Sequence, residues 1–131
     1  MAQKINNTQK NVPKIGSIAG SVFSTTGNKS VTGIGYKPSM VKFTYMASGT
    51  GAIQTGTGAM TSSAQYYASM SADSGTGRTR NSGTDAVIGI GNAGTGALYI
   101  KVAYVSMDSD GFTINVSTAD GTFPVAWETY P

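Results

Sequence analysis

The stretch LYIKVAYVSMDSDGFTINVST, residues 98–118, decides the fold of this chain. Apolar and polar residues alternate on both sides of DSDG, with Phe112, Ile114 and Val116 at every second position after the turn. A period of two is typical of a half-buried strand, and Asp-Gly between two such runs indicates a tight hairpin. The stretch therefore predicts two antiparallel strands, the second of which points Phe112, Ile114 and Val116 into a core.

The same pattern extends in both directions from this hairpin. Further strands are expected at 17–23, 30–35, 40–46, 65–72, 85–91 and 122–130, with turns at 25–30 and 36–39 and with polar loops at 47–58 and 73–83. Val41, Phe43 and Tyr45 share one face of the 40–46 strand, and Trp127 is expected in the core. Pro124 cannot donate to a ladder, so the last strand is expected at a sheet edge or with a bulge.

No segment shows a helical period, so the sequence predicts an all-β protein. With 131 residues there is room for one domain. We expect a single antiparallel β-sandwich, or jelly-roll-like domain, of about eight short strands at residues 17–131. Residues 1–16 are expected to form an extended, basic N-terminal arm.

Composition excludes several classes of chemistry. The chain has no cysteine and no histidine, which removes thiol nucleophiles and the usual neutral-pH base and metal ligand. Only 11% of the residues are charged, against about a quarter in ordinary proteins. No apolar run is long enough to cross a membrane as a helix. We therefore expect no cofactor, no metal and no membrane partner.

The positive charge of the chain is concentrated at its start. Lys4, Lys10 and Lys14 lie in a segment without acids, whereas the six basic and six acidic residues from Ile15 onward balance. A nucleic-acid binder usually carries a basic stripe with aromatics on its folded body, so we expect no nucleic acid as partner. The arm is either a solvated tail or a docking segment for another protein.

GIGNAGTG, residues 89–96, matches the glycine spacing of a dinucleotide-binding loop through Gly89, Gly91 and Gly94. That loop works because a helix begins there and its free N–H groups hold the phosphates. The residues that follow, ALYIKVAYVSM, have the alternation of a strand. We therefore interpret the glycines as a turn between two strands.

The acidic residues predict turns rather than catalysis. DSDG, residues 108–111, lacks the further ligands and the closing Glu of a calcium loop. Five of the six acids are aspartates at expected turns or strand starts, where Asp is favoured by local hydrogen bonds. Nothing in the spacing brings two carboxylates together, and we expect no enzyme activity and no catalytic residues.

Two groups of residues are candidates for binding. Arg78 and Arg80 are expected in the 73–83 loop, where they either clamp an anionic group of a partner or are simply solvated. Tyr66, Tyr67 and Tyr99 are candidates for contact with a glycan, the alternative being aromatics of the core or of an interface. Tyr66 and Tyr67 are adjacent on a strand, so they point to opposite faces.

Two stretches resemble a domain found in structural proteins of bacteriophage particles. TTGNKSVTGIGYKPSMVKFTYMASG resembles its opening, with TGN, then TG-x-G, an aromatic residue and proline before a hydrophobic strand, and VSMDSDGFTINVSTADGTFPVAWETY resembles its close. The similarity extends over residues 22–131. It implies a β-sandwich located in the virion, assembled in the host cytoplasm, with other virion proteins as partners and a homo-oligomer, by analogy a trimer.

The family's motifs are turn and strand signatures and assign no catalytic residue to this chain. Because the chain carries a short basic arm in place of a long fibre shaft, the resemblance favours a capsid or tail decoration protein. It would assemble through its arm and its sheet edges. The alternative is a carbohydrate- or receptor-binding adhesion module of a phage tail, whose partner would be a host surface glycan.

Overall fold

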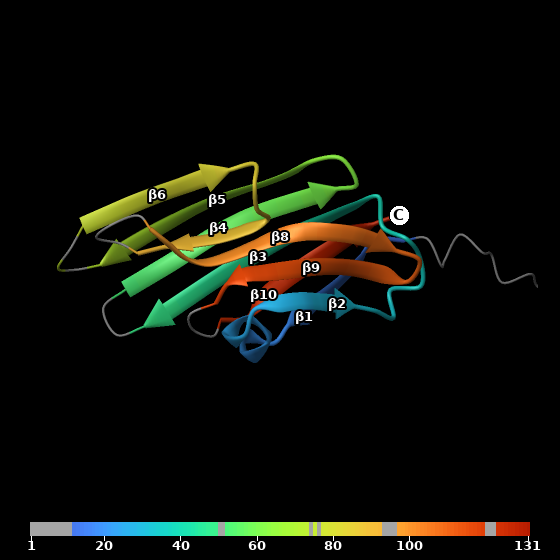
Figure 1. Ribbon diagram of the computed structural model, residues 1–131, viewed down its shortest axis with the longest axis horizontal. Coiled ribbons are helices and arrows are strands. Elements are labelled where there is room, and N and C mark those ends of the chain that lie inside the picture. Colours follow the sequence, from blue (N-terminus) through green and yellow to red (C-terminus); the bar gives the residue numbers. More distant parts are fainter. Residues whose placement is uncertain (1–11, 50–51, 74, 76, 93–96, 120–122) are drawn as a thin grey trace, which may run out of the picture.

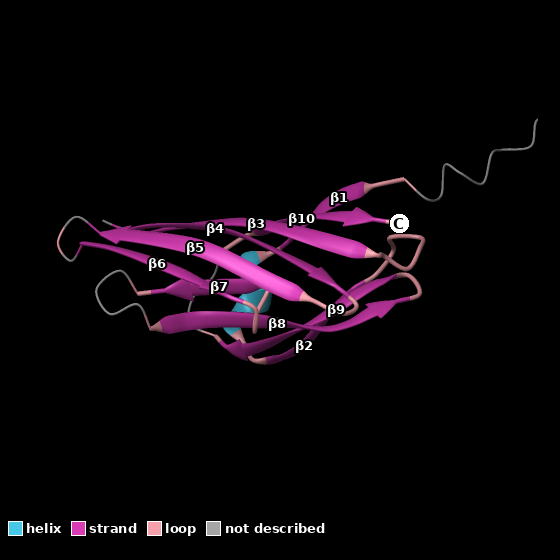
Figure 2. Ribbon diagram, turned by 90° about the horizontal axis from the view of Figure 1, so that it is seen from above, coloured by secondary structure: helices cyan, strands magenta, loops and turns pink. Residues whose placement is uncertain are grey.

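The computed structural model describes residues 12–49, 52–73, 75, 77–92, 97–119 and 123–131. The described chain is a sandwich of two antiparallel sheets, seen edge-on in Figure 2. The prediction of an all-β sandwich is confirmed. No α-helix forms in the described residues, and one turn of 3-10 helix, η2 (Gly20–Ser24), lies between the layers.

The larger sheet has six strands and the smaller has four (Figure 1). Across the larger sheet the order is β1 (Lys14–Ile18), β10 (Val125–Tyr130), β3 (Met40–Gly49), β4 (Ala52–Thr61), β5 (Gln65–Asp73) and β6 (Gly77–Gly83). Across the smaller sheet it is β2 (Gly27–Val31), β9 (Gly111–Thr118), β8 (Leu98–Asp108) and β7 (Ile88–Gly91). Because β1 pairs with β10 while β2 pairs with β9, the pairs nest as in a jelly roll.

The hairpin predicted at residues 98–118 is confirmed. It is formed by β8 and β9, which pair from Asp108 opposite Gly111. Phe112, Ile114 and Val116 are all fully buried. The predicted shared face of β3 is likewise buried, because Val41, Phe43 and Tyr45 all lie against the core.

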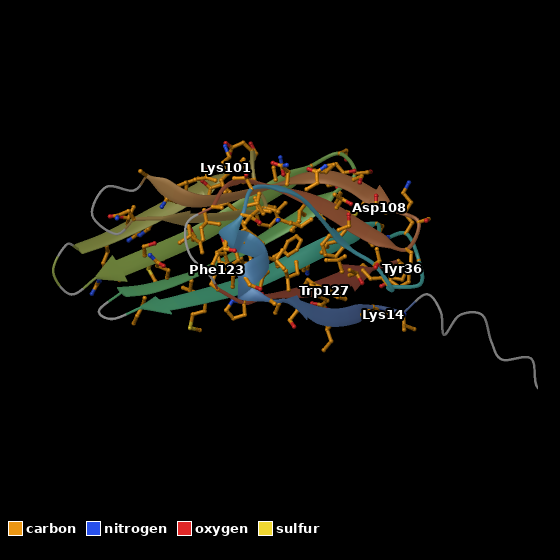
Figure 3. The ribbon with its side chains drawn as sticks, turned by 60° about the horizontal axis from the view of Figure 1, so that its bottom comes forward. Lys14, Tyr36, Lys101, Asp108, Phe123 and Trp127 are labelled. Atoms are coloured by element: carbon orange, nitrogen blue, oxygen red, sulfur yellow. The ribbon has the colours of Figure 1, made fainter. Side chains whose placement is uncertain are left out.

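Aromatic rings fill the space between the sheets. Phe23 of η2 stacks on Phe123 with ring centroids 5.1 Å apart, and Phe43 meets Phe112 edge-on at 5.7 Å. Figure 3 shows Phe123 beside the helical turn. Trp127 packs edge-on against Phe112 at 6.0 Å and is only partly buried, so it covers one side of the core. Phe43 and Trp127 belong to the larger sheet and Phe112 to β9 of the smaller one, so these rings connect the two sheets.

The loop expected at residues 47–58 is mostly strand. The strand β3 continues to Gly49 and β4 begins at Ala52, so Gly49, Gly56 and Gly58 lie inside a ladder and not in a turn. A Cβ atom on Gly58 would lie 1.7 Å from the carbonyl oxygen of Val87, and one on Gly56 would meet the Tyr45 ring. Gly58 is required by the close approach of the two layers and Gly56 by the Tyr45 ring of the neighbouring strand, and neither contact is visible in a local pattern.

The prediction of a loop at residues 73–83 is also wrong, because residues 77–83 form β6 at the edge of the larger sheet. Edge strands are often polar, which is why GRTRNSG did not look like one. With β4 and β6 included, the described residues hold ten strands rather than eight.

The beginning of the chain also differs from expectation. The first strand is Lys14–Ile18 rather than 17–23, so the sheet begins inside the range assigned to the arm. A Cβ atom on Gly20 would lie 2.7 Å from the backbone nitrogen of Phe123, and this close approach occurs where the chain turns into η2. The turn expected at 25–30 is largely β2.

Pro124 does not mark an edge strand. It lies just before β10, which is an interior strand between β1 and β3. A proline outside the ladder removes no ladder hydrogen bond, so its position is compatible with a central strand.

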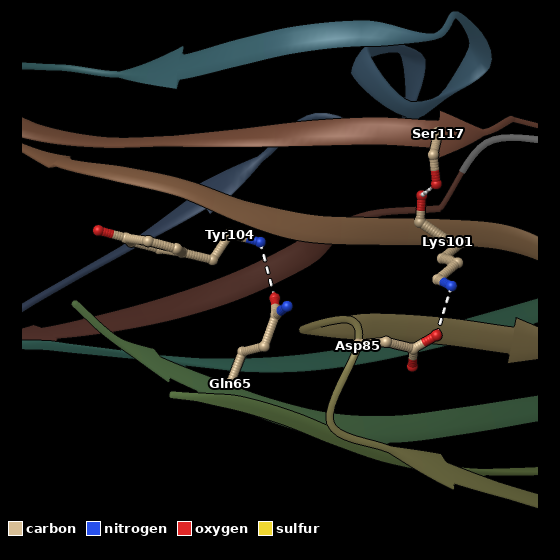
Figure 4. Close-up of polar contacts among 5 residues, drawn as sticks. All are labelled: Gln65, Asp85, Lys101, Tyr104 and Ser117. Atoms are coloured by element: carbon tan, nitrogen blue, oxygen red, sulfur yellow. Dashed lines mark hydrogen bonds and ion pairs between the residues drawn. The ribbon is translucent and has the colours of Figure 1, made fainter. Parts of the chain in front are cut away.

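Two polar contacts lie near the beginning of β7, and the first of them connects the sheets (Figure 4). The Gln65 side-chain oxygen accepts a hydrogen bond from the backbone N–H of Tyr104 at 2.8 Å, beyond the point where β7 stops pairing with β8. Lys101 on β8 forms an ion pair with Asp85, which precedes β7. The first contact satisfies an N–H that would otherwise lack a ladder partner.

Candidate functional site

The turn that contains Asp110 holds together the two stretches that carry the resemblance. The carboxylate of Asp110 accepts hydrogen bonds from the backbone N–H groups of Gly33 and Gly35, at 2.9 and 2.6 Å. The Ile34 N–H donates to the Asp110 carbonyl at 3.1 Å. Gly33 and Gly35 have φ values of +82° and +89°, a region that favours glycine. TG-x-G is therefore a loop shaped to present its N–H groups to one carboxylate.

The next residues of the same motifs also have structural roles. A Cβ atom on Gly111 would lie 1.8 Å from the carbonyl oxygen of Val31, so β2 approaches the turn too closely for a side chain. The Tyr36 hydroxyl makes a 2.8 Å hydrogen bond with the Thr129 hydroxyl, and both residues are buried. The motif residues thus join β2, β9 and β10 at one end of the sandwich.

Lys14, a candidate for partner binding, contacts this end of the sandwich as well. Its ammonium group donates to the carbonyl of Ile34 and lies 6.0 Å from the centre of the Tyr36 ring. Figure 3 shows Lys14 and Tyr36 close to each other. Lys4 and Lys10 lie outside the described residues.

Three described aspartates are held by hydrogen bonds within the fold. Asp108 accepts from the hydroxyls of Ser106 and Thr113, each at 2.6 Å, and these bonds lower the pKa of its carboxyl. The Gly35 and then the Gly33 N–H lower the pKa of Asp110. Lys101 lowers the pKa of Asp85. All three are stabilised in the ionised form, which is the state of a structural acceptor and not of a general acid.

The glycines proposed to be a turn lie in and after β7. Gly89 and Gly91 belong to the strand, and β8 begins at Leu98, so a strand follows where a dinucleotide loop requires a helix. A Cβ atom on Gly89 would lie 2.4 Å from the Tyr67 ring, which explains this glycine by packing. Gly94 lies outside the described residues.

The tyrosine candidates separate as their alternation predicts. Tyr66 is 51% exposed and Tyr67 is buried, with its ring against Gly89. Tyr67 is thereby removed from the surface candidates. Tyr99 belongs to β8, and its side chain lies outside the described part of the structure.

Arg78 and Arg80 are exposed on the edge strand β6, where they pair in register with Ala72 and Met70 of β5. They therefore belong to a sheet surface rather than to a loop tip. This surface is the side of the six-stranded sheet that faces away from the smaller sheet, and we name it the outer face.

The outer face gathers apolar side chains from four strands. Seven large apolar residues of the described chain are exposed, and five of them lie on this face: Ile15, Met46, Ile53, Tyr66 and Met70. Around them are threonine and alanine, together with Lys42, Glu128 and the two arginines. Two adjacent hollows cross the face, with Thr57 in both linings.

Sequence reasoning found Tyr66 and both arginines but not the surface that they share. Its members come from strands whose pairing and register the alternation does not specify. Exposed Ile53 and Met70 look in sequence like core residues of a strand or a loop. The face could have been recognised from Ile53 and Met70, because each points to the side of its strand opposite to the buried residues.

Comparisons with known proteins supply no family. No family model matches the chain, and no curated protein or solved structure is significantly similar to it. In the described residues no helix is long and apolar enough to span a membrane. The same residues contain no group of three or more acidic, histidine or cysteine side chains placed to bind a metal ion.

Proposed function

We propose that this chain is a non-enzymatic structural protein of a bacteriophage particle, a decoration or accessory protein of the capsid or tail surface. The observation that carries the proposal is the Asp110 turn. The two stretches that resemble the phage domain meet there through hydrogen bonds from Gly33 and Gly35 to Asp110, which is 77 and 75 positions away in the chain. The motif residues that meet at this turn stabilise the fold. Such a role is expected of motifs in a family that shares a fold but no catalytic chemistry.

Further support comes from how the polar groups are used. Asp85, Asp108 and Asp110 accept hydrogen bonds within the fold, and packed aromatic rings fill the interior. A body with few charges and a large outer face suits a component that is held in place by its neighbours. The exposed edges, β1 and β6, and the basic segment that contains Lys4 and Lys10 are the proposed contacts with other virion proteins.

The proposal is tested on purified particles of the phage whose genome encodes the chain. Immunogold labelling is expected to place the protein at regular positions on the capsid or tail. Crosslinking through Lys4 and Lys10 is expected to join it to other chains. A protein that is abundant in infected cells but absent from purified particles would overturn the proposal. Crosslinks confined to single chains would remove the arm from it.

The exposure of Tyr66 favours a second candidate, a receptor-binding module that contacts a host surface glycan. Exposed aromatic rings beside polar groups are a common way to hold a sugar ring, and Lys42 lies in the same part of the face. A glycan array probed with the chain and with Tyr66→Ala tests this function. Binding that the substitution abolishes supports it, and an array without any binding rejects it.

A further inference from the structure

The outer face is large enough to hold a stable interface. Strands lie about 4.8 Å apart and rise about 3.3 Å per residue. Six strands of five to ten residues therefore present on the order of 700 Å². A standard protein interface buries about 800 Å² on each partner. Its exposed tyrosine, methionines and arginines are residue types enriched in interfaces.

The relief of this face follows from the strand register. One row of small side chains crosses all six strands: Ser17, Ala126, Thr44, Thr57, Ala68 and Ser82. Larger side chains flank it, with Lys42 and Tyr66 on one side and Met46 and Met70 on the other. The face is therefore low in the middle and raised along two lines.

We propose that the outer face is buried against the same face of a second copy of this chain, about a two-fold axis that runs parallel to the strands between β3 and β4. This rotation places β4 of one copy over β3 of the other, and β5 over β10, without changing the row of any residue. Met46 then faces Thr55, and Lys42 faces Ala59. Tyr66 faces Glu128, whose carboxylate accepts a hydrogen bond from the phenol.

Self-pairing about a two-fold axis requires one surface to be complementary to itself. The outer face meets this requirement near the axis, because Met46 and Lys42 each meet a small side chain and Tyr66 meets a hydrogen-bonding one. Two sheets of ordinary twist pack face to face with their strands about 30° apart, so the strands of each copy lie within about 15° of the axis and the residues nearest to it stay in contact. The resulting dimer differs from the trimer that the family resemblance implies. The inference rests on the surface alone and holds in or out of a virion.

The first test is the mass of the purified full chain in solution, by light scattering or sedimentation. Interfaces of this size dissociate at about micromolar concentration or below. The wild-type chain is expected at twice its 13.4 kDa mass. Thr57→Arg, which places a charge in the low row beside the axis, is expected to give the monomer. Val105→Arg is the matched control, because Val105 is exposed on the smaller sheet, and is expected to leave the dimer intact.

Three results would overturn the pairing. One is a wild-type monomer at about a hundred times micromolar concentration, which would leave the face to a different partner. The second is a trimer. The third is a Thr57→Arg chain that associates as the wild type does.

A second variant keeps the test decisive if Thr57→Arg does not fold. The chain has no cysteine, so Thr57→Cys carries a single thiol beside the proposed axis. A bis-maleimide with a spacer of about 10 Å, the distance between packed sheets, is expected to join two copies. Val105→Cys is expected to give little product. Equal yields from the two variants, or none from Thr57→Cys, would contradict the proposal.

Discussion

The two exposed faces of the sandwich differ in the side chains that they present, although in both sheets alternate residues point outward. On the smaller sheet several outward polar residues of β2, β8 and β9 are hydrogen-bonded to one another. Ser30 meets Thr113 at 2.8 Å, and Thr113 in turn donates to Asp108. Because Thr113 has one hydroxyl proton, Ser30 is the donor in the first bond. Asn115 donates to Asn28 at 2.8 Å.

On the larger sheet the outward residues are mostly apolar or small. Lys42 lies 5.3 Å from the centre of the Tyr130 ring, and Thr55 donates to the Tyr45 carbonyl. Met46 and Ile53 are both 62% exposed, and among the side chains that the structure describes on the smaller sheet their only large apolar counterpart is Val105, at 41%. Polar groups on the smaller sheet are thus satisfied by hydrogen bonds within the face. The larger sheet exposes apolar surface, and burying that surface against a partner would be favourable.

The contrast between the two faces depends on the contact between the two sheets. The largest effect is expected from a substitution that breaks this contact. Gly58→Ala places a Cβ atom 1.7 Å from the Val87 carbonyl oxygen, so the layers must separate. We expect a loss of more than about 3 kcal/mol in the free energy of unfolding. Urea denaturation measures it, with Gly75→Ala as control because a Cβ atom there meets nothing within 4 Å. Equal midpoints for the two variants would contradict this account of the glycine.

The next largest effect is a loss of stability at alkaline pH, caused by the buried hydroxyl of Tyr45. Burial raises the pKa of Tyr45 from 10.0 to about 12. A raised folded pKa gives stability that is fully present below pH 10 and is lost as the pH rises toward 12. We expect about 2 to 3 kcal/mol to be lost over this range. Denaturation at several pH values measures it, and Tyr45→Phe should flatten the slope. A wild-type slope that Tyr45→Phe leaves unchanged would assign the effect to other groups.

The polar face can be weakened through Asp108. Its folded pKa lies below the ordinary 3.8, so its contribution is present above that pH and is lost as the pH falls through the folded pKa. Asp108→Asn is expected to lower the free energy of unfolding at pH 7 by about 1 kcal/mol, allowing for solvent screening. At a pH below the folded pKa its melting temperature should meet that of the wild type. A difference independent of pH would show that the charge is irrelevant.

The smallest effect compares matched serines, one on each face. Both Ser117 and Ser82 are exposed on strands, but the Ser117 hydroxyl donates to the Lys101 carbonyl at 3.2 Å. Ser117→Ala is expected to cost about 0.5 kcal/mol of stability. Ser82→Ala should change it by less than about 0.3 kcal/mol. The reverse order, measured by urea denaturation, would contradict the contrast between the faces.

Much of the fold could be predicted where neighbours in sequence decide it. The β8–β9 hairpin follows from alternation and one Asp-Gly turn, and the buried side of β3 from Val41, Phe43 and Tyr45. The failures share a physical cause. Gly58 and Gly20 are fixed by contacts with distant segments and Gly56 by a ring on the paired strand, and such glycines look like turns when only the sequence is read.

The candidate site could be predicted only residue by residue. The opposite orientation of Tyr66 and Tyr67 follows from strand geometry alone. The meeting of Asp110 with Gly33 and Gly35, and the shared surface of Ile15, Met46 and Met70, depend on strand order and register. Alternation assigns a residue to one of two sides but does not say which strand lies beside it.

The strand order of the larger sheet has a consequence for how the molecule is made. Β10, formed by residues 125–130, lies between β1 and β3, which are formed by residues 14–18 and 40–49. A nascent chain shorter than about 125 residues therefore lacks β10 and cannot complete its larger sheet. Until β10 is made, β1 and β3 have no strand to pair with at the edges that β10 will occupy. Pairing over such separations is slow. Synthesis is thus expected to outpace closure, which leaves these edges to a chaperone or to rapid completion of the chain.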